Sequence, residues 1–198
     1  MLQHVVQGIS APGPKTREHN VTAPDSTGER FEDLFLAHYP RIVGILNRML
    51  GDRARAEDLA NETFLKLYRH PLPHQPDGNV SGWLYRTATN LGIDALRSTA
   101  RRIRYEEAAA RAEIENSPTE SALDQALRAE KQQRVRSVLA GMKPVHAQAL
   151  LLRASGHSYK ELADSLRVGL GAVGTLLIRA EAAFEQRYRD LFGEEEGL

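Results

Sequence analysis

From Phe31 onward, apolar residues recur every third or fourth position, and this spacing constrains the fold more than any other feature of the sequence. Phe31, Leu34, Ile42 and Met49 begin a pattern that would form one apolar stripe on a helix. No segment alternates apolar and polar residues as a half-buried strand does. The spacing predicts helices over residues 31–50, 53–69, 81–104, 127–142, 144–156, 158–166 and 173–191, and therefore an all-α fold.

Residues that favour helix ends stand at the boundaries of these segments. Glycine commonly ends a helix, and a short polar side chain caps the next one by accepting a backbone hydrogen bond. Proline suits the first position of a helix. These rules predict a stop at Gly51, caps at Asp52 and Ser81, a start at Pro144, and a capping box formed by Ser158 and Glu161.

The predicted helices fall into two groups, separated by a segment of different composition. Between residues 106 and 128 six residues are acidic and two are basic, and Ser117 and Pro118 interrupt the segment. We predict two small helical domains, at residues 29–105 and 127–192, joined by an acidic linker at 106–126. Residues 1–28 are expected to be a disordered tail, and residues 193–198 an acidic tail.

The composition excludes several classes of protein. The chain has no cysteine, so disulfides, thiolate metal sites and cysteine nucleophiles are ruled out. No glycine-rich phosphate loop, GxSxG or HExxH motif is present, so we expect no enzyme, catalytic residue, metal or cofactor. The longest uncharged apolar stretch, residues 168–178, is too short for a bilayer, and the start lacks a secretory pattern. We therefore expect a cytoplasmic protein without membrane insertion.

Residues 158–189 have the pattern of a helix-turn-helix, whose second helix can enter a DNA major groove. A plain corner between two helices of a bundle would show the same pattern. Basic and acidic residues are equal in number in the whole chain, 26 each, and between residues 157 and 189 five are basic and four acidic. Because phosphate neutralisation drives non-specific affinity, this domain alone should bind DNA weakly.

The end of the third predicted helix is more basic. Arg97, Arg101, Arg102 and Arg104 lie within eight residues with no acidic residue among them. Upstream stand two aromatic residues, an arginine and an amide, and such side chains stack on unpaired bases, follow phosphates and read base edges. A solvated helix end and a tryptophan in the core are the alternatives. The upstream residues are Trp83, Tyr85, Arg86 and Asn90.

A third feature is an acidic and amide-bearing face on the second predicted helix. It consists of Glu57, Asp58, Asn61 and Glu62. Such a face could contact a basic partner helix, or it could simply be a solvated surface.

Two stretches carry a resemblance to a known family. AEDLANETFLKLY at residues 56–68 resembles region 2.2 of the sigma-70 family, and SGWLYRTATNLGIDALR at residues 81–97 resembles regions 2.3 and 2.4. The order of parts, without an intervening region-3 domain, resembles the extracytoplasmic-function (ECF) group, over roughly residues 29–190. The resemblance implies region 2 at 29–105 and a region-4 helix-turn-helix at 127–192.

The resemblance implies a transcription initiation factor. Its partners would be core RNA polymerase, through the β′ clamp helices and the β subunit, promoter DNA, and an anti-sigma factor. It would recognise the minus-35 and minus-10 elements and help open the duplex. A stand-alone helix-turn-helix regulator, or a helical adaptor that binds a partner, remains an alternative.

Site residues follow from the matched positions. The resemblance implies polymerase contacts at Asp58, Asn61 and Glu62, with Phe64 in the core. It implies minus-10 DNA contacts at Trp83, Arg86, Asn90, Asp94, Arg97, Arg101 and Arg102. It implies minus-35 DNA contacts at Ser158, Lys160, Gly171, Thr175 and Arg179.

The second domain departs from the family pattern. Members often carry basic residues within the recognition helix, whereas residues 172–181 here read AVGTLLIRAE. Gly174, Leu176 and Glu181 occupy positions where a basic residue is common, and Arg179 remains. Minus-35 recognition would then depend on Thr175, Arg179, Lys160 and the backbone amides that begin the helix, or this surface would bind a regulator instead.

Overall fold

The computed structural model describes residues 26–69, 79–110 and 120–193. The chain forms α1 (Ser26–Leu50), α2 (Arg53–Arg69), α3 (Val80–Ala110), α4 (Glu120–Gly141), α5 (Pro144–Ala154), α6 (Tyr159–Leu166), the short 3₁₀ helix η1 (Leu170–Ala172) and α7 (Val173–Phe192). These described residues contain no strand, which confirms the all-α prediction. None of their helices combines the length and apolar character needed to cross a membrane.

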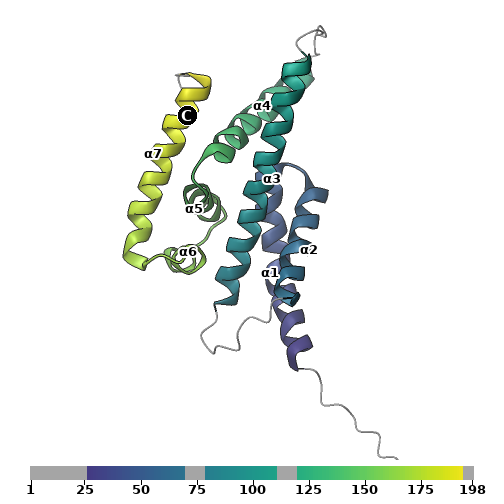
Figure 1. The fold of residues 1–198 in the computed structure, drawn as a ribbon, viewed down its shortest axis with the longest axis vertical. Helices are drawn as coiled ribbons and strands as arrows, with labels where there is room; N and C mark the ends of the chain where they lie inside the picture. Colours follow the sequence, from purple (N-terminus) through teal and green to yellow (C-terminus); the bar gives the residue numbers. More distant parts are fainter. Residues whose placement is uncertain (1–25, 70–78, 111–119, 194–198) are drawn as a thin grey trace, which may run out of the picture.

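The first three helices form a bundle whose core follows the predicted apolar stripes. Ile42 and Leu46 of α1, Phe64 of α2 and Leu84 of α3 are each at most 2% exposed. Gly92 of α3 leaves room for the Met49 side chain of α1, because a Cβ atom there would lie 2.6 Å from the Met49 Cε atom. The three helices run side by side in Figure 1, with α3 the longest. The burial of Phe64 confirms its predicted place in the core.

Most predicted helix ends are confirmed. Gly51 has a φ angle of 68°, which glycine adopts readily, and its amide donates to the Asn47 carbonyl. The Asp52 carboxylate accepts a hydrogen bond from the Arg55 amide at 3.0 Å. Pro144 is at the start of α5, and Ser158 and Glu161 form the capping box of α6.

The predicted cap at Ser81 is wrong. Asn79 caps α3 instead, since its side-chain oxygen accepts from the Gly82 amide at 2.7 Å. An asparagine serves this position as well as a serine does, and Asn79 stands two residues earlier. The Ser81 hydroxyl lies within the first turn of α3 and contacts Nε2 of His38 on α1 at 3.1 Å.

Three helices extend five or more residues beyond their predicted bounds. α1 begins at Ser26, α3 continues to Ala110, and α4 begins at Glu120. Alanine and glutamate are strong helix formers, so residues 106–110 add turns to α3. Residues 111–119 therefore remain between α3 and α4, fewer than in the predicted linker at 106–126. Most of the predicted tails (residues 1–25 and 194–198) and residues 111–119 lie outside the described residues.

The C-terminal helices pack on α3 rather than standing apart from it. α4, α5 and α6 each contact α3, while α7 packs on α5 and α4. Figure 1 shows α5 and α6 between α3 and α7. The two predicted domains thus form one packed structure.

Candidate nucleic-acid interface

Six of the seven residues predicted to contact minus-10 DNA share one face of α3. An α-helix turns about 100° per residue, so their positions fall within an arc of about 80°. This α3 face consists of Trp83, Arg86, Asn90, Asp94, Arg97 and Arg101. Arg102 lies outside the arc.

The members of the α3 face differ in exposure. Asn90, Asp94 and Arg101 are exposed, whereas Trp83 and Arg97 are half-buried. Trp83 packs against the hydrophobic core, so only part of its ring is accessible for stacking. Arg102 is exposed as well. The face therefore combines an accessible amide with cationic side chains, the groups needed to read a base edge and follow phosphates.

Gln148 of α5 contacts the centre of this face. Its side chain is 5% exposed. Its Nε2 atom lies 2.9 Å from Oδ1 of Asn90, 3.0 Å from the Thr89 hydroxyl and 3.3 Å from the Arg86 carbonyl. The acceptor atom of the Asn90 amide is therefore already engaged within the chain.

Two arginines of the α3 face also contact the C-terminal helices. Arg97 donates from Nε to the Ala140 carbonyl at 3.1 Å and from Nη2 to the Met142 carbonyl at 3.2 Å. Arg86 lies 3.5 Å from the Ser165 carbonyl. Burial, and then the charge of Arg167, lower the pKa of Arg86 from its ordinary value.

Beside the α3 face, α1, α3 and α6 meet in an interdomain cluster of Arg41, Tyr85, His157 and Glu161. The guanidinium of Arg41 lies 3.2 Å from the Glu161 carboxylate and over the Tyr85 ring. His157 is fully buried, with its ring edge-on to Tyr85 at a centroid distance of 4.5 Å. Its Nδ1 atom lies 3.0 Å from the Leu152 carbonyl, and its Nε2 atom is buried without a partner.

The electrostatics of the interdomain cluster favour a neutral histidine and a charged glutamate. Burial, and next the charge of Arg41, lower the pKa of His157. Hydrogen bonds from the Ser158 amide and hydroxyl, followed by the interaction with Arg41, lower the pKa of Glu161 to about 2.

The residues predicted to contact polymerase lie on an open surface. Asp58, Asn61 and Glu62 of α2 are all exposed, and Glu62 pairs with Lys66 at 3.2 Å. Leu65 and Tyr68, which the sequence analysis did not select, are 44% and 74% exposed and continue along the same helix. This α2 face, defined as Asp58, Asn61 and Glu62, is not covered by the C-terminal helices.

The residues predicted to contact minus-35 DNA lie on α6, η1 and α7. Lys160, Gly171, Thr175 and Arg179 are exposed. Ser158 is exposed too, but its hydroxyl is engaged with Glu161 in the capping box. Ile178, which was not selected, is 68% exposed on the same helix as Thr175 and Arg179. Of the five residues, Lys160 and Arg179 are charged.

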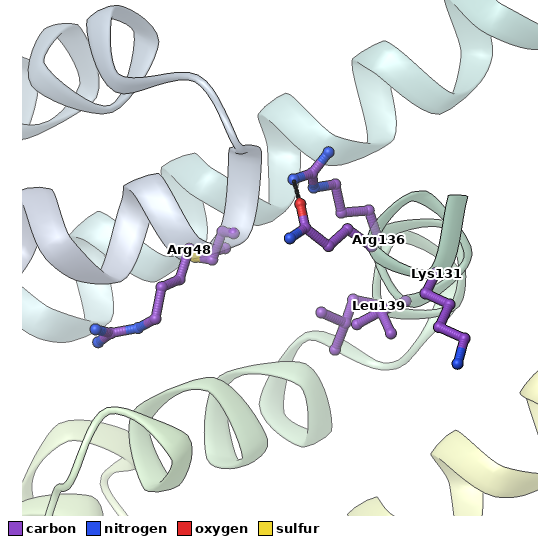
Figure 2. Close-up of a pocket in the computed structure, with 7 residues that line it drawn as sticks. Arg48, Lys131, Arg136 and Leu139 are labelled. Atoms are coloured by element: carbon purple, nitrogen blue, oxygen red, sulfur yellow. Dashed lines mark hydrogen bonds between the residues drawn. The ribbon is translucent and has the colours of Figure 1, made fainter. Parts of the chain in front are cut away.

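An open hollow lies between the end of α1 and α4 (Figure 2). Its volume is about 200 Å³, below the about 300–1,000 Å³ of a small-molecule site. Arg48, Lys131 and Arg136 stand at its edge, and Arg136 donates to Gln132. No group of three or more histidine, aspartate or glutamate side chains among the described residues could hold a metal ion.

Gln148, Arg41 and His157 are the residues that sequence reasoning missed. Each is a single polar residue within an ordinary helical pattern, without a motif around it. One signal was available for Gln148, which stands among the apolar residues of α5 at helical spacing. A polar side chain on an apolar face needs a hydrogen-bond partner, so this position indicated a buried contact.

Comparisons with known proteins agree on one family. Residues 34–102 match the family described as Sigma-70 region 2. The chain is 32% identical over 171 residues to the RNA polymerase sigma factor CarQ of Myxococcus xanthus, covering 86% of this chain and 93% of that protein. It is 32% identical over 176 residues to the ECF RNA polymerase sigma factor SigE of Mycolicibacterium smegmatis, covering 84% and 65% respectively.

The chain is also similar to solved structures. One of them is the sigma factor RpoE in complex with the anti-sigma factor NepR from Bartonella quintana, with a TM-score of 0.47 and 19% sequence identity. The similarity covers 81% of this chain and 98% of that chain.

Proposed function

The chain belongs to the sigma-70 family of RNA polymerase sigma factors, in its ECF group, and we propose that it binds core RNA polymerase and directs it to promoters. It acts as an initiation factor and carries out no chemistry of its own. Since its partner is the transcribing polymerase, its place of action is the cytoplasm. An anti-sigma factor is a further proposed partner.

The observation that carries this proposal is the α3 face. One amide, Asn90, is exposed and lies among arginines on one side of a long helix. A base pulled out of the duplex needs a group that reads its edge, and the strand around it needs cations for its phosphates. We assign minus-10 recognition to this face, together with Arg102, within a region 2 at residues 29–105.

The α2 face is assigned to the polymerase. Asp58, Asn61 and Glu62 offer carboxylates and an amide to a partner helix, and charged groups of this kind give an interface its orientation and specificity. Leu65 and Tyr68 would add apolar contact at one end of the face.

Minus-35 recognition is assigned to Ser158, Lys160, Gly171, Thr175 and Arg179, in a region 4 at residues 127–192. This surface has few cations, so its own affinity for DNA should be low. Two weak DNA-binding surfaces joined through one polymerase nevertheless bind strongly, because the first contact raises the effective concentration for the second.

Transcription with purified components tests the proposal. Core polymerase from the source organism is incubated with and without the protein on fragmented genomic DNA, and the 5′ ends of the transcripts are mapped. We expect new, discrete start sites that share upstream elements and depend on the protein. The absence of both core binding and new start sites would reject the assignment.

A further inference from the structure

We propose that α7 reads its DNA element through methyl groups, with the side chains of Thr175 and Ile178 packed against the C5-methyl groups of neighbouring thymines. The inference rests on the proposed assignment of minus-35 recognition to the helix-turn-helix. It adds the kind of base that α7 selects, namely thymine in an A·T base pair, and it adds Ile178 as a residue that determines this selection.

The first argument is the position of Ile178 on the exposed side of α7. We define the reading edge of α7 as five exposed side chains in the N-terminal half of the helix, whose positions fall within an arc of about 120°. The opposite side of the helix is buried through Val173, Leu177 and Ala180. The N-terminal part of a recognition helix is the part that contacts base edges. The reading edge consists of Ala172, Thr175, Ile178, Arg179 and Ala182.

The second argument is the chemistry of the reading edge. Ala172, Ile178 and Ala182 end in methyl groups, and Thr175 carries a methyl group beside its hydroxyl. A guanine or an adenine is read by paired hydrogen bonds from an arginine, lysine, asparagine or glutamine, and Arg179 is the one member of the edge of these types. Thymine presents a methyl group in the major groove, where an apolar side chain can contact it.

The third argument is the exposure of an isoleucine at this place. Ile178 is 68% exposed, so a ligand that covers it removes a large apolar side chain from water. This burial is favourable when the covering group is apolar. A base that presents a hydrogen-bonding group there would instead lose its water without gaining a partner, which is costly. Ile178 therefore favours a methyl group and disfavours a polar base edge.

The fourth argument is the room for close approach beside the reading edge. Two carbon atoms attract each other most strongly at about 3.5–4.0 Å, so α7 has to lie close to the bases. Packing within the protein does not require the glycines at this end of the helix. A Cβ on Gly171 would have nothing within 4 Å, and one on Gly174 would lie 3.9 Å from Cε2 of Tyr159. The absence of side chains there lets the backbone come nearer to a ligand.

Uracil in place of thymine tests the proposal, because the two bases pair alike and differ only in the C5-methyl group. The template is the promoter with the strongest start site from the transcription mapping described above. Each thymine of its minus-35 element, on either strand, is replaced by deoxyuridine one at a time. Initiation is measured with core polymerase and a limiting concentration of the full chain.

For the wild type, uracil at one or more positions should lower initiation about threefold to fourfold, the effect of one methyl group removed from an apolar contact. Ile178→Ala should initiate less on the thymine template. Uracil at the position that contacts residue 178 should then have less than about a twofold further effect, because the partner of that methyl group is already gone. Thr175→Ser keeps the hydroxyl and removes the methyl group, and it should show the same loss of uracil sensitivity at a neighbouring position.

Leu191→Ala is the matched control variant. Leu191 is an aliphatic residue on the opposite side of α7 and is 47% exposed. This variant should respond to each uracil as the wild type does. The control template carries uracil only between the minus-35 and minus-10 elements, and it should be transcribed like the thymine template.

The outcomes separate the methyl contact from the proposed function. If the protein initiates but no uracil in the minus-35 element lowers initiation, or if that element holds no thymine on either strand, the methyl contact is overturned and the proposed function stands. If Ile178→Ala loses the same factor on thymine and uracil templates, Ile178 acts through another contact, such as a protein partner, and its assignment is overturned. If the wild type initiates at no promoter, the proposed function fails and the methyl contact fails with it.

Discussion

At the scale of the residue, Asn90 has the position that the minus-10 assignment most depends on. It is exposed at the middle of the α3 face, with an amide that can both donate and accept. Arg86 and Arg97 lie on the same side of the helix, about one and two turns away. An amide between two cations is suited to hold a base while the backbone on either side is neutralised.

Replacing this amide should reduce promoter discrimination. An amide contact to a base edge contributes about 1–3 kcal/mol. Asn90→Ala should therefore lower the preference for an intact minus-10 element over a substituted one about tenfold, with core binding unchanged. The measurement is transcription from paired promoters, beside a titration of core polymerase. Thr99→Ala, exposed on the opposite side of α3, is the control; a variant as selective as wild type would remove Asn90 from the site.

Arg167 is notable for its backbone conformation rather than for contacts of its side chain. It ends α6 in the left-handed region, with a φ angle of 56°. Side chains other than glycine and asparagine are disfavoured there by about 1 kcal/mol. The turn that follows Arg167 leads to η1 and α7.

Relieving this strain should stabilise the protein. Arg167→Gly should raise the free energy of unfolding by about 0.5–1 kcal/mol, after allowance for the greater freedom of glycine in the unfolded chain. Urea denaturation measures the change. Arg153→Gly, within α5, should instead be destabilising, and a loss of stability in Arg167→Gly would contradict the argument.

At the scale of the element, α2 illustrates how one helix serves two surfaces. Leu59, Phe64 and Leu67 face the core, while Asp58 and Glu62 face solvent. The two sets interleave at the spacing of a helix, so the exposed charges can change without disturbing the packed side. The exposed residues of α2 can therefore be substituted to test the proposed polymerase contact while the core stays intact.

Charge reversal on this helix should weaken polymerase binding. Asp58→Arg with Glu62→Arg should lower the affinity for core polymerase about tenfold or more, because like charges then face the partner. The fold should be retained, since both residues are exposed. Glu185→Arg with Asp190→Arg on α7 makes the same change in net charge elsewhere. Equal affinities of the two double variants in a pull-down titration would remove the α2 face from the site.

At the scale of the whole molecule, the two halves are joined around a buried histidine. His157 faces Arg41 and Arg48 from α1, Tyr85 from α3 and Glu161 from α6. Its Nδ1 atom lies 3.0 Å from the Leu152 carbonyl and 3.3 Å from Nη2 of Arg41, and its Nε2 atom is buried without a partner, so an added proton would bring a charge beside Arg41 with no acceptor at Nε2. The packing around this histidine therefore favours its neutral form.

This preference predicts a pH dependence of stability. The pKa of His157 in the folded protein lies below the ordinary value of 6.5, and that of His38 is lowered too. Below pH 6.5 the unfolded chain binds more protons than the folded one, so stability should fall as the pH decreases toward 5. Glu161, with its pKa at about 2, stays charged through this window.

Equilibrium denaturation at several pH values checks the prediction. One proton taken up by His157 on unfolding gives a slope of at most about 1.4 kcal/mol per pH unit. His157→Phe keeps a ring against Tyr85 and removes this titration, so its slope should be smaller, with a remainder from His38. An unchanged slope in this variant would show that His157 does not carry the dependence.

Rules based on nearby residues, namely helix caps and apolar spacing, predicted much of the secondary structure. The bounds predicted for residues 53–69 match α2, because Asp52 caps it and its apolar residues have an unbroken period. The capping box at Ser158 is confirmed for the same reason. The predicted cap at Ser81 was wrong because Asn79, two residues earlier, is an equally good cap. The Ser81 hydroxyl instead contacts His38, which is remote in sequence.

The sequence by itself determined the helices, their buried sides and the family, because these depend on side-chain spacing and on short motifs. Only the tertiary structure decided that the C-terminal helices cover part of the α3 face. That contact joins Asn90 to Gln148 and Arg41 to Glu161, residues 58 and 120 positions apart. Single polar side chains carry no periodic signal, so their pairing becomes defined only when the packing of the helices brings the two residues together.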